Sequence, residues 1–320
     1  QTAVVTGGTR GIGFEVAKTL AYGGARVIMV SRKLESGRKA MLSISEGAKE
    51  MPDHHGAVDL RFMECEFGDL RSVKTVADQL AEEEPRLDIL VNNAGIGVAP
   101  YGLDNDGIER IFGVNVVGHF LFTNRLLPLM RTTSHRGGPA PRIISVTSNL
   151  HQLAPSTTTF SSLEELNNPN LRVDQYYARS KLAVILYIRA LVHRSLYNDR
   201  ILAMSVHPGA VSTDIQLQVH EAFGPILGRV VTALQTPLLR APDEGSLGVL
   251  WAAATPGDEL VNRGLQGAYI TDPGKAGGQT ELATDPQLEE NVWSLCERLI
   301  REKIGDDALL DWASTFKYKA

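Results

Sequence analysis

The stretch Thr6–Gly13, TGGTRGIG, decides which fold the sequence predicts. It follows a short apolar run, Ala3–Val5, that is typical of a buried strand, and it leads into a helical pattern of apolar residues from Phe14 to Leu20. Glycines let a backbone approach a pyrophosphate, and a helix N-terminus offers free N–H groups to it. The order strand, glycine-rich turn and helix therefore predicts a phosphate-binding loop, with an ordinary glycine turn as the alternative.

The end of the next predicted strand indicates which dinucleotide the loop would bind. Residues 26–30 form a strand-like run that ends in Ser31, Arg32 and Lys33. An acidic residue at this place would hydrogen-bond the ribose hydroxyls of NAD. A hydroxyl and two cations, together with Arg10 in the glycine loop, suit a 2′-phosphate instead. The pattern favours NADP(H) over NAD(H), and solvated surface arginines are the alternative interpretation.

Strands and helices alternate over the whole chain. Further strands are predicted at 59–66, 87–91, 142–146, 201–206 and 267–270. Helices are predicted at 107–130, 177–188, 244–254 and 286–304, together with a helix and a polar loop within 34–57 and a helix that starts near residue 70. This alternation predicts an α/β fold, a Rossmann-type doubly wound parallel sheet of about seven strands with helices on both faces. We expect a single domain over 1–320. Residues 214–241 break the helical pattern and are rich in aliphatic side chains, so 212–262 is the expected substrate-binding lid.

Two more strand ends carry candidate ligand contacts. Glu66 and Phe67 follow the third strand and are expected to border an adenine. Asp69 is placed to cap the next helix. The fourth strand ends in Asn92–Gly95, NNAG, where small residues would let a ligand lie against the backbone.

Candidate catalytic residues follow in the second half. Tyr177 and Lys181 are four residues apart, so in a helix they share one face. A phenol has a pKa of about 10, and we expect the neighbouring ammonium to lower it. Ser148 stands at the end of the fifth strand. Asn115 lies in an apolar helical stretch, where it is either a satisfied core amide or the support of a water chain.

The composition of the chain indicates which partners and which cellular compartment are expected. The 320 residues include 43% apolar and 22% charged side chains, and the net charge of −5 argues against a nucleic-acid partner. Two cysteines form no disulfide framework, which favours the reducing cytoplasm. We find no metal-ligand spacing and no apolar run of about 18 residues that would cross a membrane. The chain starts on a strand-like run, so a leader or anchor before Gln1 stays open.

These motifs, in this order and spacing, resemble the short-chain dehydrogenase/reductase superfamily over about residues 2–273. Within it the chain is most similar to the branch of retinol dehydrogenases and WW-domain oxidoreductases, and to fungal reductases of secondary metabolism. The narrower similarity rests on residues 106–109, residues 115–121, the long insert between Ser148 and Tyr177, and residues 180–183.

The resemblance implies a catalytic role for four residues. Tyr177 would protonate a carbonyl oxygen in reduction or accept the proton in the reverse direction. Ser148 would hold the substrate oxygen, Lys181 would lower the pKa of Tyr177 and bind the nicotinamide ribose, and Asn115 would support a water relay. Tyr176 is excluded because the residue four positions beyond it is a serine.

The resemblance also implies a cofactor site that runs along the ends of the strands. The glycine loop would face the pyrophosphate, the basic residues the 2′-phosphate, and the segment after the sixth strand the nicotinamide. Glu66 replaces the aspartate common in the family. The expected cofactor residues are Thr6, Gly7, Thr9, Arg10, Gly11, Ile12, Gly13, Ser31, Arg32, Lys33, Glu66, Phe67, Asn93, Ala94, Gly95, Tyr177, Lys181, Pro208, Gly209, Val211 and Thr213.

The sequence thus predicts an NADP(H)-dependent oxidoreductase that acts on a carbonyl or secondary alcohol of a fairly large apolar substrate. Its expected partners are this substrate and a second copy of the chain in a homodimer. Two alternatives remain. The first is a non-redox catalyst, such as a dehydratase, epimerase or cyclase, that retains the cofactor. The second is a non-enzymatic NADP(H) sensor.

Overall fold

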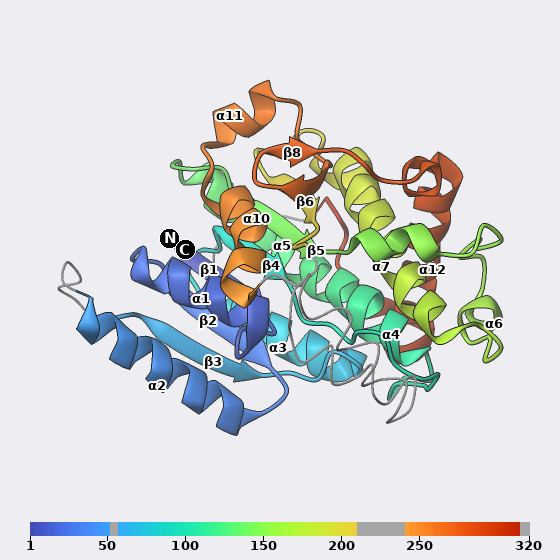
Figure 1. The fold of residues 1–320 in the computed structure, drawn as a ribbon, viewed down its shortest axis with the longest axis horizontal. Helices are drawn as coiled ribbons and strands as arrows, with labels where there is room; N and C mark the ends of the chain where they lie inside the picture. Colours follow the sequence, from blue (N-terminus) through green and yellow to red (C-terminus); the bar gives the residue numbers. More distant parts are fainter. Residues whose placement is uncertain (52–56, 210–240, 314–320) are drawn as a thin grey trace.

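The computed structural model describes residues 1–51, 57–209 and 241–313 of the chain. Its centre is one eight-stranded sheet in the order β3-β2-β1-β4-β5-β6-β7-β8 (Figure 1). Neighbouring strands from β3 to β7 are parallel, and β8 is antiparallel to β7. The strands are β1 (Thr2–Thr6), β2 (Arg26–Ser31), β3 (Leu60–Glu64), β4 (Ile89–Asn92), β5 (Arg142–Val146), β6 (Leu202–Val206), β7 (Tyr269–Asp272) and β8 (Lys275–Ala276).

Helices cover both faces of this sheet, because alternate residues of each buried strand point to opposite sides. In β1, Ala3 and Val5 belong to the core on the face that is covered by α1 (Gly11–Tyr22), α2 (Leu34–Glu50) and α10 (Pro242–Ala254). Val4 points to the other face. That face is covered by α3 (Leu70–Glu83), α5 (Gly118–His135), α7 (Val173–Leu191) and α12 (Pro286–Ile304). The doubly wound α/β architecture expected from the sequence is confirmed.

The remaining helical segments are short or irregular. They are α4 (Arg110–Phe112), the π-helical turn η1 (Gly113–Val117), η2 (Asn149–Leu153), α6 (Leu163–Leu166), the π-helical turn η3 (Val192–Leu196), α11 (Gly257–Asn262), η5 (Glu281–Thr284) and η6 (Asp306–Ala308). None of the helices that the structure describes combines the length and hydropathy that a bilayer span requires.

Strand β1 lies between β2 and β4. From β1 the chain first builds the sheet in one direction, through β2 and β3, and then in the other, from β4 onward. In open parallel sheets a ligand binds outside the carboxyl ends of the strands at such a switch point. The glycine loop leaves β1 at this place, and the segment Asn93–Gly95 leaves β4 beside it. The topology therefore brings the two predicted cofactor segments together.

Several boundaries differ from the sequence-based ones. The short edge strand β8 was not predicted, because two residues carry no periodic pattern. The helix expected over 107–130 begins at Arg110 and contains η1, so it is not a regular α-helix throughout. The last parallel strand lies at Tyr269–Asp272, two residues later than expected.

Only part of the expected lid region lies in the described residues. Residues 212–240 are outside them, and residues 241–262 contain α10 and α11. Val249 and Ala252 of α10 are fully buried in the core that α1 and the sheet share. Helix α10 is thus one of the layer helices, and the lid interpretation is confined to 212–240.

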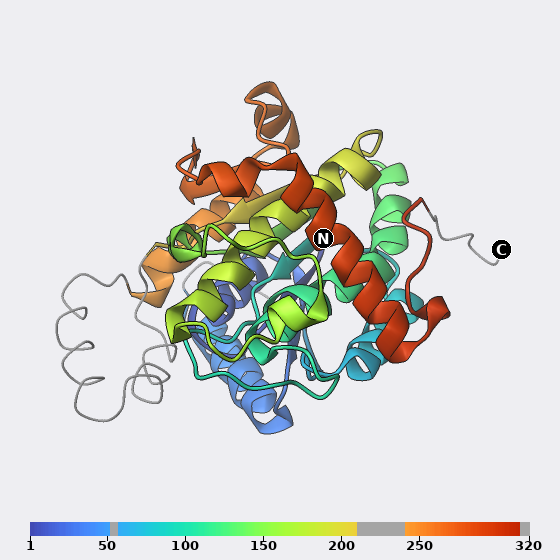
Figure 2. The ribbon, with the colours of Figure 1, turned by 90° about the vertical axis from the view of Figure 1, so that its right-hand side faces the viewer.

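The carboxyl-terminal helix α12 buries Trp293, Leu295 and Leu299. It packs along α7, as Figure 2 shows. The segment after α12 continues over the same layer, where the ring of Trp312 contacts Phe120 at 5.0 Å and Trp293 at 4.4 Å between centroids. The end of the described chain is therefore part of the core that supports α5 and α7.

Candidate active site

The glycine loop has the backbone that its sequence predicts. Gly7 and Gly11 have φ angles of +65° and +56°, in the left-handed region where a Cβ atom is disfavoured. The N–H of Gly7 donates to the carbonyl of Val30 at 2.7 Å, which fixes the loop to β2. At Gly13 a Cβ atom would collide with the amide nitrogen of Asn93 and the carbonyl of Gly7. Glycine is required here because α1 packs directly on the two strand ends.

The first turn of α1 is suited to bind an anion. Arg10 is its N-cap residue, and its side chain makes no capping hydrogen bond to the helix. No acidic residue occupies the first turn. The N–H groups at this helix start, left without a side-chain cap, match the phosphate oxygens of a dinucleotide in hydrogen bonding and charge. These residues thus fit the pyrophosphate of a nicotinamide cofactor.

Thr6 joins the ends of β1 and β4. Its Oγ1 accepts hydrogen bonds from the N–H groups of Asn93 and Ala94, both at 2.9 Å. The side-chain amide of Asn93 donates in return to the carbonyl of Thr6 at 2.9 Å. Three hydrogen bonds therefore hold the glycine loop and the NNAG segment in a fixed relation.

The residues expected at the adenosine end lie after β2 and β3. Ser31 Oγ is 3.3 Å from Thr9 Oγ1, so the β2 end contacts the glycine loop. The exposed guanidinium of Arg32 lies 3.8 Å from a carboxylate oxygen of Glu66. Phe67 differs from its expected position, because its side chain is 2% exposed and packs in the core. An adenine contact from Phe67 would be limited to its backbone.

Tyr177 and Lys181 lie one turn apart on α7, and Lys181 is tied to β5. The ammonium of Lys181 is 5.5 Å from the centroid of the Tyr177 ring and donates to the carbonyl of Val146 at 2.9 Å. In turn Thr147 Oγ1 donates to the carbonyl of Lys181 at 2.7 Å. Because Ser148 follows Thr147, these bonds place the serine at the end of β5 beside the Tyr–Lys face of α7.

The neighbouring tyrosine is turned elsewhere. Tyr176 donates its hydroxyl hydrogen bond to the carbonyl of Asn168 at 3.0 Å, and its ring packs beside that of Tyr101. The choice of Tyr177 over Tyr176, made in the sequence from the position of Lys181, agrees with this geometry.

Burial sets the protonation of the pair. It raises the pKa of Tyr177 to about 12, although a hydrogen bond with Ser148 acts in the opposite direction. It lowers the pKa of Lys181 to about 8. The expectation that the lysine lowers the pKa of the phenol is therefore not met, because burial of the phenol dominates. Tyr177 is a protonated phenol at neutral pH, and Lys181 keeps most of its positive charge there.

The question left open for Asn115 is answered by its hydrogen bonds. Its Oδ1 accepts from the N–H of Ile96 at 2.8 Å. Its Nδ2 donates to the Ile96 carbonyl and to Ser180 Oγ, both at 3.0 Å. The side chain is a satisfied core amide that joins η1, α7 and the NNAG segment. Gly95 makes this possible, since a Cβ atom there would lie 3.0 Å from Asn115 Oδ1.

Comparison with known proteins agrees with this geometry. Residues 1–222 match the family model described as short chain dehydrogenase. The chain belongs to the short-chain dehydrogenase family.

Relatives of this family cover nearly the whole chain. Human retinol dehydrogenase 14 is 31% identical over 94% of this chain and 86% of its own length. The short-chain dehydrogenase/reductase drtF of Aspergillus calidoustus is 31% identical over 94% of this chain and 93% of its own. A solved short-chain dehydrogenase of Burkholderia cenocepacia in complex with NADP is 26% identical, covers 85% of this chain and 96% of its own, and has a TM-score of 0.60.

As a short-chain dehydrogenase, the protein is an oxidoreductase of the class that uses a nicotinamide cofactor. The similarity to retinol dehydrogenases and to fungal reductases expected from the sequence is confirmed. Of the expected nicotinamide contacts in this short-chain dehydrogenase, Pro208 and Gly209 directly follow β6. Val211 and Thr213 lie outside the described residues.

Sequence analysis missed two histidines that hold the Ser148 turn of this short-chain dehydrogenase. His151 Nδ1 lies 2.8 Å from the carbonyl of Ser148, and its Nε2 accepts from the N–H of Thr280 at 3.2 Å. His207 Nδ1 accepts from the N–H of Asn149 at 3.3 Å. The signal was present, since His207 directly follows the sixth strand and His151 stands three residues after Ser148. Only the fold shows that both meet at one turn.

Proposed function

We propose that this short-chain dehydrogenase is an NADP(H)-dependent enzyme that interconverts a carbonyl and a secondary alcohol on a fairly large apolar substrate. The observation that carries the proposal is the position of Tyr177 and Lys181 on one face of α7, held by the Val146 carbonyl and Thr147 beside Ser148. A proton donor, a cation and a hydroxyl then share the end of the sheet where the glycine loop starts.

When bound, the cofactor supplies or accepts the hydride. In reduction the protonated phenol of Tyr177 would give its proton to the substrate oxygen, and in oxidation the phenolate would take it back. The hydroxyl of Ser148 would donate a hydrogen bond to the same oxygen and keep it near the phenol. Lys181 would place a positive charge near the phenol and favour its ionised form in the transition state.

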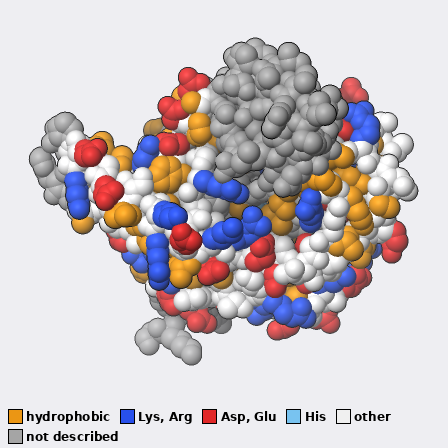
Figure 3. Space-filling view, turned by 60° about the horizontal axis from the view of Figure 1, so that its bottom comes forward, with side chains coloured by type: hydrophobic (Ala, Val, Ile, Leu, Met, Phe, Trp, Pro, Cys, Tyr) orange, Lys and Arg blue, Asp and Glu red, His pale blue; other side chains and the backbone are white. Residues whose placement is uncertain are grey.

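The basic residues at the strand ends support NADP(H) over NAD(H). Arg32 and Lys33 are exposed directly after β2, and Arg10 is exposed at the start of α1. The ion pair between Arg32 and Glu66 is long and exposed to solvent, so a 2′-phosphate would compete for the guanidinium at little cost. Lys and Arg side chains gather near the centre of the face in Figure 3.

Apolar side chains near Ser148 support an apolar substrate. Leu150 and Leu153 of η2 are 36% and 47% exposed, directly after the catalytic serine. Residues 212–240, which contain many aliphatic side chains, follow β6 and are our proposed lid. A retinol dehydrogenase among the relatives is consistent with such a substrate.

The first test mixes the protein with NADPH and a panel of bulky apolar ketones and follows nicotinamide absorbance. We expect turnover that Tyr177→Phe reduces by roughly two to four orders of magnitude, with NADPH binding retained. If no ketone is reduced and Tyr177→Phe equals the wild type, the redox proposal is wrong. A product of unchanged oxidation state would then indicate a dehydratase, epimerase or cyclase.

The second test concerns the 2′-phosphate. Arg32→Ala should weaken NADPH binding about tenfold or more, the usual loss of a charge-assisted hydrogen bond, and should leave NADH binding nearly unchanged. Lys49→Ala, which removes an exposed cation at the far end of α2, is the matched control. Equal affinities of the wild type for NADPH and NADH would refute the cofactor preference.

We also propose a reducing compartment, the cytoplasm, since Cys65 and Cys296 are both free and buried. A homodimer remains our proposal for the assembly. Sedimentation of the purified protein tests the dimer, and fractionation of the source cells tests the compartment.

A further inference from the structure

His119 is a buried histidine that the proposed reaction does not use. It is the second residue of α5, directly after the π-helical turn that contains Asn115, and is 3% exposed. Its Nδ1 lies 2.9 Å from the carbonyl oxygen of Val114, and its Nε2 lies 2.9 Å from Oγ1 of Thr6. The imidazole thus spans the space between η1 and the end of β1.

The partners of the ring determine where its proton lies. A carbonyl oxygen only accepts hydrogen bonds, so Nδ1 must carry the proton and donate it to Val114. In the neutral ring Nε2 is then an acceptor, and the hydroxyl of Thr6 must donate to it. The carbonyl of Val91 is a second acceptor for this hydroxyl, but at 3.4 Å it is much farther away.

This proton arrangement explains how Thr6 can serve two backbone groups. Because its hydrogen points to His119, both lone pairs of Oγ1 remain for the N–H groups of Asn93 and Ala94. All donors and acceptors of the threonine hydroxyl are then used. Burial lowers the pKa of His119 to about 3, so the ring stays neutral over the whole physiological range.

Aromatic packing fixes the plane of the ring. Phe67, after β3, stacks on His119 with the ring centroids 4.4 Å apart and the planes 16° apart. Phe122 in turn packs edge-on against Phe67. The imidazole cannot rotate out of its two hydrogen bonds without a clash with this stack.

We propose that His119 is a positioning residue for the cofactor site, because it accepts the hydrogen bond of the Thr6 hydroxyl and thereby locks the ends of β1 and β4 to the turn that contains Asn115. The inference rests on the proposed use of a nicotinamide dinucleotide. It adds a residue that touches neither cofactor nor substrate and acts on the dinucleotide through Thr6, Asn93 and Ala94.

Replacement of the ring has a defined consequence. In His119→Phe the aromatic stack on Phe67 is kept, but the Thr6 hydroxyl loses its acceptor and the Val114 carbonyl loses its donor. A buried hydroxyl without an acceptor rotates to find one, and either Asn93 or Ala94 then loses its partner. His119→Gln retains one amide donor and one carbonyl acceptor and is the conservative variant.

The experiment measures NADPH binding by fluorescence, steady-state kinetics, and hydrogen exchange at the amides of Asn93 and Ala94. We expect His119→Phe to weaken NADPH binding about tenfold or more, to speed exchange at both amides, and to affect kcat less than cofactor affinity. His119→Gln should recover most of the affinity. His193→Phe is the control, a histidine of η3 whose ring contacts Glu289 at 3.1 Å, and should alter neither the NADPH Kd nor these two amides.

A double-mutant cycle with Thr6→Val tests whether His119 affects NADPH binding through Thr6. If His119 acts through Thr6, His119→Phe should add almost nothing to the loss of NADPH affinity in Thr6→Val. Additive losses would overturn the proposal, and so would unchanged exchange at Asn93 and Ala94 in a folded His119→Phe or His119→Gln. A wild type that binds no NADPH would refute the proposed function instead, and the exchange data, which need no cofactor, would still decide the role of His119.

Discussion

The ammonium of Lys181 donates a hydrogen bond to the main-chain carbonyl of Val146 at 2.9 Å. This contact joins the helix that contains Tyr177 to the end of β5, two residues before Ser148. Within residues 1–51, 57–209 and 241–313 Lys181 has no carboxylate partner, and burial alone lowers its pKa. The cation therefore lowers the stability of the fold, as is common for residues retained for function.

We predict that Lys181→Met stabilises the protein at pH 7. Burial lowers the lysine pKa from 10.5 to about 8 in the folded state, so between these values the unfolded chain binds more protons. Stability then rises with pH, and below about pH 8 the full cost is present. At about 1.4 kcal/mol for each pKa unit, less the Val146 hydrogen bond, Lys181→Met should gain about 1–3 kcal/mol at pH 7.

Urea unfolding of the wild type and Lys181→Met at several pH values measures this gain. The difference between them should shrink as the pH rises from 8 to 10, while Lys49→Met, an exposed change, should show no such trend. A wild type that is more stable than Lys181→Met at every pH would contradict the prediction. Activity should be lost in Lys181→Met in either case.

The second prediction concerns the pH dependence of catalysis. Burial raises the pKa of Tyr177 to about 12, so the phenol keeps its proton throughout the neutral range. Reduction, which needs the protonated acid, should vary little between about pH 6 and 7, below the pKa of about 8 of Lys181, whereas oxidation, which needs the base, should rise with pH over the same range. Initial rates in both directions at constant ionic strength test this, and a reduction rate that falls steeply between about pH 6 and 7 would be inconsistent with it.

Gly13→Ala should damage the cofactor site. The added Cβ atom would collide with Asn93 and Gly7, which form part of the contact between the two strand ends. We expect NADPH affinity to fall about tenfold or more, since overpacking usually costs about 1–3 kcal/mol. Gly23→Ala is the control, because its Cβ atom would lie 3.4 Å from the nearest carbonyl oxygen, in ordinary contact. Similar Kd values for both variants would argue against the loop as the binding site.

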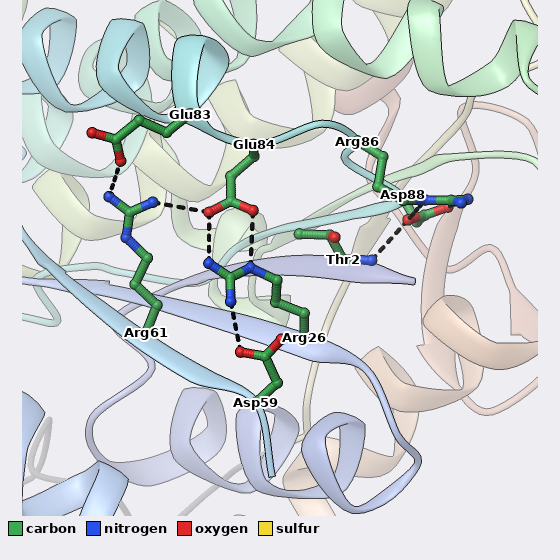
Figure 4. Close-up of polar contacts among 8 residues, drawn as sticks. All are labelled: Thr2, Arg26, Asp59, Arg61, Glu83, Glu84, Arg86 and Asp88. Carbon is green, nitrogen blue, oxygen red and sulfur yellow. Dashed lines mark hydrogen bonds and ion pairs between the residues drawn. The ribbon is translucent and has the colours of Figure 1, made fainter.

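The fourth prediction concerns an ion-pair network around the buried Glu84, at the amino ends of β2 and β3 (Figure 4). Glu84, 5% exposed, accepts two hydrogen bonds from Arg26, at 2.9 and 3.0 Å, and one from Arg61 at 2.9 Å. Burial raises the pKa of Glu84, but the two guanidinium groups outweigh it, and the net pKa is lowered. Its contribution is present above the ordinary pKa of a glutamate and is lost as acid protonates it.

Glu84→Gln should reduce the free energy of unfolding by about 2 kcal/mol or more, because it leaves both arginines without their shared carboxylate. The matched change Glu83→Gln removes an exposed partner of Arg61 and should cost less than about 0.5 kcal/mol. Denaturant unfolding of both variants at pH 7 compares them. NADPH binding should be unchanged in both variants, since the network lies at the amino ends of the strands and the proposed cofactor site at their carboxyl ends. A loss of NADPH binding would contradict the independence of these two regions.

Features that depend on residues close in sequence were predictable, and features that depend on distant residues were not. Local patterns predicted the glycine loop, the strand that ends at Ser148 and the Tyr–Lys helix, because each depends on residues a few positions apart. The protonation of Tyr177 was not predictable, since burial is a property of the whole core. The side chain of Phe67 was misplaced for the same reason, because nothing local indicates that it packs on His119.

By itself, the sequence determined the α/β fold and the family and named candidate residues for proton transfer, because glycine spacing and helical periodicity can be recognised along the chain. Only the tertiary structure decided how these residues are held. It showed that the side chain of Asn115 makes three hydrogen bonds and that His151 and His207 both contact the turn at Ser148. It also showed that His119 joins the end of β1 to η1. Five of these seven hydrogen bonds join residues at least 19 positions apart in the sequence, so they exist only after the sheet has formed.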